Sequence, residues 1–179
     1  MIYSLQSKDD TSSITEVYTI GHSNRHIGDF FKDMSLFSIQ LLVDIRSRPY
    51  SRYAIHFNKN RLANTCAEQG IEYVYMGNLL GGKPKDSSIR NKLDIIDYEL
   101  LAKKDYFISG INSVLSLATE TRVCLMCSEG HPSICHRGFL IGPLLEKKEA
   151  KVLHILPGGI AVGTAELRFN DTGHQMRLL

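Results

Sequence analysis

The sequence has little that would mark a secreted or membrane protein. Only four of its 179 residues are cysteine and five are proline, and the formal net charge is +2. No apolar run approaches the roughly 20 residues that a transmembrane helix needs. Residues 1–10 lack the basic start and apolar centre of a signal peptide, so we expect a cytoplasmic protein with no membrane partner. In a reducing cytoplasm the cysteines are expected to be free thiols or metal ligands, and a total charge this small says almost nothing about partners.

What the sequence does contain is the composition of a soluble globular domain, with 43% hydrophobic and 22% charged residues. Internal repeats, low-complexity segments and linkers are absent from the sequence. We therefore expect one domain over residues 1–179. Residues 1–15 are interpreted as a polar leader, and the tail at 160–179 as either a short hairpin or a surface segment.

The segments that resemble strands alternate with segments that resemble helices. Strands are predicted at residues 16–20, 39–45, 71–76, 122–126 and 151–156. Helices are predicted at 27–37, 59–69, 106–120 and 132–148, with a partly irregular helix within 85–104 and a loop at 79–84. This order predicts an α/β fold with three layers, in which a mostly parallel sheet of about five strands has helices on both faces.

Unusual polar residues follow the predicted strands. His22 follows the first strand, Asp44 and Arg46 finish the second, and Cys127 and Glu129 follow the fourth. In open parallel sheets, ligands bind outside the carboxyl ends of the strands. We therefore expect these residues to line one edge of the sheet and to form an active or binding site.

The segment from Val123 to Arg137 is the predicted centre of that site. Pro132 suits the first position of a helix, which places His136 and Arg137 near the helix N-terminus. Basic side chains there oppose the helix dipole unless an anion lies beside them. We therefore hypothesise that Arg137 and Arg46 share one phosphate-like ligand.

A cluster of arginines supports the same type of ligand. Arg46, Arg48 and Arg52 lie within seven residues, and a guanidinium group suits phosphate. Tyr50, Tyr53 and Phe57 supply rings for stacking. The ligand-binding residues are predicted to be His22, Asn24, Arg46, Arg48, Arg52, Cys135, His136 and Arg137. A solvated surface of ion pairs is the alternative interpretation of the arginines.

Three residues are candidates for catalysis. Cys127 is a possible nucleophile, since a strand end ahead of a helix N-terminus can stabilise a thiolate. Glu129 or Asp44 would serve as acid or base. The alternatives are that Cys127 is a buried core thiol and that Asp44 forms an ion pair with a neighbouring arginine. The spacing from Cys127 to Arg137 does not match a tyrosine-phosphatase loop.

A metal site is a separate possibility. Cys124 and Cys127 are an odd number of residues apart, so on a strand their side chains point to opposite faces. We therefore expect no tightly bound structural zinc and no cofactor, and assign no metal ligand. A metal site made of Cys127, Cys135 and His136 stays open as an alternative, because these residue types ligate zinc.

Four motifs together resemble those of the domain of unknown function 488 family. They are Thr19-Ile-Gly-His-Ser-Asn24, Val43-Asp-Ile-Arg46 with Pro49 and Ser51-Arg52, Tyr73 with Leu79-Leu-Gly-Gly82, and Cys127-Ser-Glu-Gly-His-Pro-Ser-Ile-Cys-His-Arg137. The resemblance covers about residues 17–156, and Ser128 stands where the family is expected to have alanine. It implies a cytoplasmic α/β domain without an assigned reaction.

We thus expect an intracellular α/β protein that binds a nucleotide or nucleic acid at the strand carboxyl ends, with Cys127 as nucleophile if it is an enzyme. The rival hypotheses are a non-catalytic nucleic-acid-binding module and a metal-binding protein. The sequence leaves the substrate, the reaction and the oligomeric state open.

Overall fold

The computed structural model describes residues 14–170, so the predicted leader lies almost wholly outside the described residues, as does the tail from 171. The described strands form a six-stranded sheet in the order β3-β2-β4-β1-β5-β6. The strands are β1 Glu16–Gly21, β2 Leu41–Asp44, β3 Glu72–Tyr75, β4 Val123–Cys127, β5 Lys151–Leu156 and β6 Ile160–Gly163. The first five are mutually parallel, which confirms the predicted mostly parallel sheet.

The sixth strand comes from the tail that the sequence left undecided. β6 pairs antiparallel with β5, so residues 151–163 form a hairpin. Its turn uses Gly158 and Gly159 at φ values of +92° and +75°, a region that glycine adopts without steric cost. The helix α7, Thr164–Asn170, follows directly.

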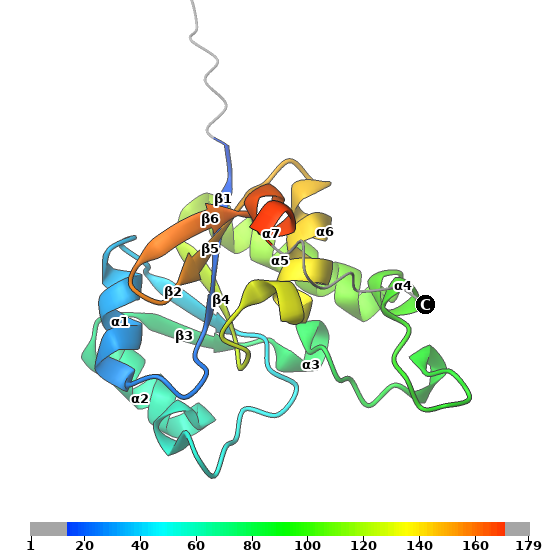
Figure 1. Cartoon of the computed structure of the whole chain (residues 1–179), viewed down its shortest axis with the longest axis horizontal. Helices are drawn as coiled ribbons and strands as arrows, with labels where there is room; N and C mark the ends of the chain where they lie inside the picture. Colours follow the sequence, from blue (N-terminus) through cyan, green and yellow to red (C-terminus); the bar gives the residue numbers. More distant parts are fainter. Residues whose placement is uncertain (1–13, 171–179) are drawn as a thin grey trace, which may run out of the picture.

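The described helices lie on both faces of the sheet, as predicted (Figure 1). One face is covered by α1, Ile27–Ser35, and α2, Lys59–Glu68, whose buried side chains include Phe30 and Leu62. The other face is covered by α3 Gly77–Leu80, α4 Tyr98–Ala102, α5 Asp105–Glu120 and α6 Gly142–Glu146. The three-layer α/β fold is therefore confirmed.

The central strand β4 divides its side chains between the two layers. Val123, Leu125 and Cys127 pack in the layer with α5, whereas Cys124 and Met126 pack in the layer with α1. This alternation is the period of two expected of a strand. The prediction that Cys124 and Cys127 point to opposite faces is confirmed.

The segment after β4 differs from the single helix predicted over residues 132–148. It comprises a 3₁₀ turn at Pro132–Ile134, a π-helical turn at Arg137–Ile141 and the short α6. Cys135 between the turns is extended, with φ −126° and ψ 140°. Pro143 lacks the N–H that a continuous helix would use to bond residue 139, which favours the wider π turn there.

Two further segments also depart from prediction. The loop expected at 79–84 begins inside α3, and the region 85–104 holds only a 3₁₀ turn at Ser87–Ile89 and the five-residue α4. Gly110 of α5 allows α3 to pack closely, because a Cβ at this position would lie 2.8 Å from Leu80 Cδ2. Within residues 14–170, every helix is too short or too polar to cross a bilayer.

Candidate functional site

The site lies at the carboxyl ends of β1, β2 and β4, which are neighbours in the sheet. Gly21 pairs with Cys127, and Asp44 pairs with Met126. The residues that follow these strands are therefore brought to one edge, where the sequence placed them. The hydrogen-bond partners of each of these residues determine whether its side chain is free to contact a ligand.

Asp44 and Arg46 form a buried ion pair at this edge. Arg46 donates from Nε to Asp44 Oδ1 at 2.8 Å and from Nη2 to Asp44 Oδ2 at 2.6 Å. Arg46 also donates to the carbonyl of Phe57, and Tyr73 donates its hydroxyl to Asp44 at 2.6 Å. Asp44 is completely buried and accepts from these groups with both oxygens. It braces the loop after β2, an arrangement that favours the ion-pair alternative, and its catalytic role stays a prediction.

His22 belongs to the same network as a neutral ring. Its Nδ1 lies 2.7 Å from the Ser23 carbonyl and its Nε2 lies 3.0 Å from Arg46 Nη1, so the Nδ1 proton is donated and Nε2 accepts. Burial and the charge of Arg46 lower the pKa of His22 to about 4. The ring stacks on Phe57 at a centroid distance of 4.4 Å. Because Phe57 is fully buried, it does not offer the stacking surface for a ligand that the sequence suggested.

Arg137 is buried beneath the turn that follows β4. Its Nη1 donates to the Glu129 carbonyl at 2.6 Å and its Nη2 donates to the Gly130 carbonyl at 2.9 Å. The side chain has no exposed surface, and its Nε has no partner among the described residues. Its donors face the backbone and not an open cleft, so the predicted phosphate shared by Arg137 and Arg46 does not fit this arrangement.

Gly21 completes the support of this turn. A Cβ at Gly21 would lie 1.9 Å from the Glu129 carbonyl oxygen and 2.8 Å from Arg137 Nη2. Real Cβ atoms do not approach backbone so closely, so only glycine allows the turn to lie against β1. The position of Glu129 is therefore set by β1 and Arg137 together.

Cys127, Cys135 and His136 form a buried cluster beside that turn. Their exposed fractions are 4%, 2% and 7%, and their ligand atoms lie within 4.8 Å of one another. The two sulfurs are each 3.7 Å from His136 Nδ1. Glu129 Oε2 accepts from Cys127 at 2.8 Å and from Cys135 at 3.3 Å. The sequence predicted all four residues for the site, and the fold brings them together.

The two thiols of the cluster ionise differently. The hydrogen bond from Cys127 lowers the pKa of the Cys135 thiol, and His136 and Arg137 act in the same direction. The same hydrogen bond and burial raise the pKa of Cys127 well above its usual value. The first proton is therefore lost from the pair of thiols, at a pKa that belongs to both sulfurs together. For Glu129, partial loss of solvent around the carboxylate raises the pKa, but hydrogen bonds led by that from Cys127 leave it lowered.

A polar pocket of about 350 Å³ opens next to the cluster. Its lining comprises His22, Ser23, Asn24, Arg46, Tyr50, Ser51, Ala54, Ser128 and Glu129. The three serines and Ala54 were not predicted as pocket residues, although Ser23 and Ser128 follow strands β1 and β4 as the predicted residues do. Tyr50 was expected to supply a ring for stacking, and it lines the pocket. Glu129 is common to the pocket and the cluster.

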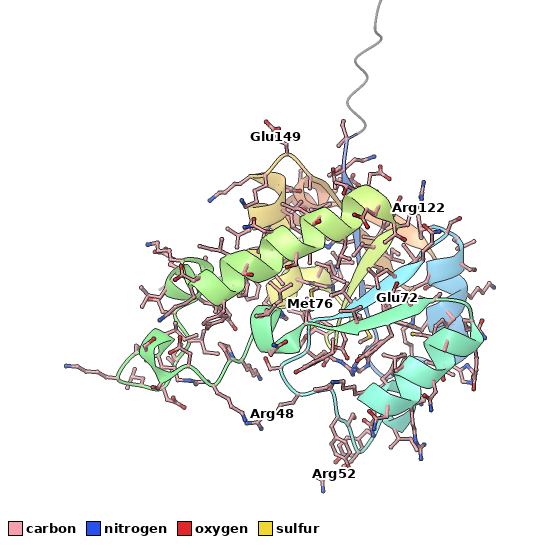
Figure 2. The ribbon with its side chains drawn as sticks, turned by 180° about the vertical axis from the view of Figure 1, so that it is seen from behind. Arg48, Arg52, Glu72, Met76, Arg122 and Glu149 are labelled. Carbon is pink, nitrogen blue, oxygen red and sulfur yellow. The ribbon has the colours of Figure 1, made fainter. Side chains whose placement is uncertain are left out.

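Arg48 and Arg52 lie outside the pocket. Both are exposed, and Figure 2 shows them projecting from the segment between β2 and α2. Tyr50 and Tyr53 of the same segment are 71% and 87% exposed. This segment therefore presents two arginines and two aromatic rings to solvent beside the pocket.

Replacing Asp44 with asparagine tests its role as a brace. Asp44→Asn leaves the guanidinium of Arg46 buried without a countercharge, and the free energy of unfolding should fall by about 3–5 kcal/mol in urea. Asp94→Asn is the matched control, since Asp94 pairs with Arg90 at 3.2 Å but its side chain is 83% exposed. The control should change stability by less than about 1 kcal/mol. Equal stability of Asp44→Asn and the wild type would contradict the bracing role.

The low pKa of His22 predicts acid sensitivity. The unfolded ring binds a proton near pH 6.5 and the folded ring only near pH 4, so stability is complete above pH 6.5 and is lost as the pH falls between these values. At pH 5 the loss from His22 should be about 2 kcal/mol. Denaturant unfolding at pH 7 and pH 5 measures it, and His22→Gln should show the smaller decrease. Identical pH dependence in the two proteins would refute the assignment.

A comparison with protein-family models matches residues 26–144 to "Domain of unknown function DUF488". The match covers more than half of the chain, and it includes the Asp44–Arg46 pair and the whole of the cysteine cluster. The comparison with curated proteins and the comparison with solved structures found no match. The chain therefore belongs to the DUF488 family.

Proposed function

We propose that the protein binds a phosphate-bearing ligand, a nucleotide or single-stranded nucleic acid, in the pocket at the carboxyl ends of β1, β2 and β4. The observation that carries the proposal is the position and lining of this pocket. It lies where parallel sheets place their ligands. Its walls combine an arginine, an asparagine and three serines, which can donate hydrogen bonds to phosphate oxygens.

One donor of Arg46 is available to a ligand. A guanidinium group carries five N–H donors. Four are directed to Asp44, to the Phe57 carbonyl and to His22. The fifth is on Nη1, beside His22, and both residues line the pocket. The ion pair with Asp44 holds this donor in place, so Arg46 supports binding through orientation more than through net charge.

The exposed segment between β2 and α2 favours a nucleotide-type ligand over free phosphate. Tyr50 lines the pocket, and its largely exposed ring offers a face on which a base can stack. Arg48 and Arg52 are exposed nearby and suit the phosphates of a chain that continues beyond the pocket. Stacking and phosphate binding of this kind are largely independent of sequence, which suits a single strand.

Thiol catalysis is supported less well than binding. Cys127 is 4% exposed, and its pKa is raised by the hydrogen bond to Cys135 and by burial. Neither Cys127 nor Cys135 lines the pocket. A nucleophile must reach its substrate as a thiolate. The proposal is therefore limited to binding, and the thiols are given a different role below.

Fluorescence anisotropy with a labelled single-stranded oligonucleotide tests the proposal. Tyr50→Ala should weaken binding by about 1–3 kcal/mol, because it removes a stacking face. The double variant Arg48→Ala, Arg52→Ala should also weaken binding and should reduce the slope of log K against log salt by about 0.7 for each phosphate that an arginine no longer neutralises. A mononucleotide and inorganic phosphate, added as competitors, separate recognition of the base from recognition of phosphate alone.

The matched control is Lys147→Ala, Lys148→Ala. It removes the same number of exposed positive charges, but from the segment just before β5, which lies at the amino end of that strand and not at the carboxyl ends where the pocket is. Its affinity and salt dependence should equal those of the wild type. Equal weakening by both double variants would show a non-specific charge effect, and the absence of oligonucleotide binding by the wild type would contradict the proposal.

A further inference from the structure

We infer that Cys127, Cys135 and His136 form a binding site for a divalent metal ion of the zinc type, to which Glu129 adds a fourth ligand. The inference goes beyond the proposed function and stands without it. It replaces the expectation of no bound zinc, because that expectation rested on Cys124 as a ligand. Cys124 lies in the other layer of the fold and takes no part in the cluster.

The separations within the cluster match a tetrahedral site. Zinc binds sulfur at about 2.3 Å and nitrogen at about 2.0–2.1 Å, so neighbouring sulfur and nitrogen ligands lie about 3.6 Å apart. His136 Nδ1 is 3.7 Å from Cys127 Sγ and 3.7 Å from Cys135 Sγ. Glu129 Oε2 accepts from the same sulfurs at 2.8 and 3.3 Å, but it does not belong to the group of atoms that all lie within 4.8 Å of one another, so its exposed side chain would have to rotate to reach the ion.

The orientation of His136 is that of a metal ligand. Its Nε2 lies 2.9 Å from the Leu80 carbonyl oxygen, so Nε2 carries the proton and donates it. Nδ1 is then left with a lone pair that faces the two thiols. A metal-bound histidine typically donates its other N–H to a backbone carbonyl or carboxylate in this way. A Cβ at Gly82 would lie 2.7 Å from His136 Cγ, so a glycine at this position allows the ring to sit where it does.

The break in the helix after β4 explains how adjacent residues can both be ligands. Cys135 is extended and His136 begins the next turn, with φ −55° and ψ −21°. This change of backbone conformation turns the two neighbouring side chains toward the same point, at the end of β4 where Cys127 lies. In the uninterrupted helix expected from the sequence, the side chains of Cys135 and His136 would diverge by about 100° around the axis.

The ligand types select the ion. Two thiolates and an imidazole favour zinc over magnesium or calcium, which prefer oxygen ligands. Binding would displace the protons of the Cys127 and Cys135 thiols to solvent, and the two thiolates would balance the charge of the ion.

Titration of the full, metal-stripped chain with Co²⁺ alone tests the inference. One Co²⁺ per chain should give the visible bands of a tetrahedral site and thiolate-to-metal absorption in the near ultraviolet, and Zn²⁺ should abolish both. Cys135→Ser should weaken Co²⁺ binding by more than the ~10–100-fold that is typical when a residue hydrogen-bonded to a metal ligand is removed. Glu129→Gln should weaken Co²⁺ binding by about 10-fold or more and should change the visible bands of bound cobalt.

Cys124→Ala is the matched control, because it removes a buried thiol from the same strand on the opposite face. Its cobalt spectrum and affinity should equal those of the wild type. Thiolate absorption that persists in Cys135→Ser, or is lost equally in Cys124→Ala, would overturn the assignment.

Glu129 is exposed, so Glu129→Gln tests the site even if Cys135→Ser does not fold. Unchanged cobalt affinity and bands in that variant would exclude Glu129 as a ligand. The assay contains no phosphate ligand, so its outcome is independent of the proposed function.

Discussion

The buried guanidinium of Arg137 is the group on which the arrangement of the site depends. A charge without exposed surface must direct its donors to partners within the protein, because burying it unpaired is costly. Arg137 directs them to the carbonyls of Glu129 and Gly130, and Gly21 leaves the space for this turn. The backbone of Glu129 is thereby fixed, and with it the direction in which the carboxylate leaves the chain.

Glu129 in turn connects the cysteine cluster with the polar pocket, two neighbouring sites of different chemistry. On one side its carboxylate accepts from the thiols of Cys127 and Cys135, and on the other it lines the polar pocket. Because two thiolates already balance a divalent cation, a metal ion in the cluster would leave the negative charge of Glu129 in place, and the two proposals stand independently of each other.

Much of the fold could be predicted from local sequence patterns. The five parallel strands are short apolar runs, and the amphipathic spacing of Phe30, Phe31 and Met34 identifies α1. Because polar residues followed these strands, the edge that carries the site could also be predicted. The odd spacing of Cys124 and Cys127 was enough to place them on opposite faces.

What could not be predicted depends on interactions between segments. Arg137 near a helix N-terminus suggested an anion, since its carbonyl partners on the preceding turn have no sequence signal. Asp44 could be a base or a brace until Tyr73 and Arg46 were placed around it. The helix break at Cys135 is invisible to hydrophobic periodicity, yet it determines that Cys135 and His136 converge. Each of these misses involves a buried polar group whose role is set by tertiary partners.

The central claim is that Arg137 holds the site together and does not bind the ligand, and Arg137→Lys tests it most directly. Lysine keeps the positive charge, but its compact ammonium group cannot bridge two carbonyls as the planar guanidinium does. The account predicts that the free energy of unfolding in urea falls by about 1.5–3 kcal/mol, the contribution of one hydrogen bond to a charged group. Unchanged stability together with weaker binding of inorganic phosphate would contradict it, and would show that Arg137 faces a ligand.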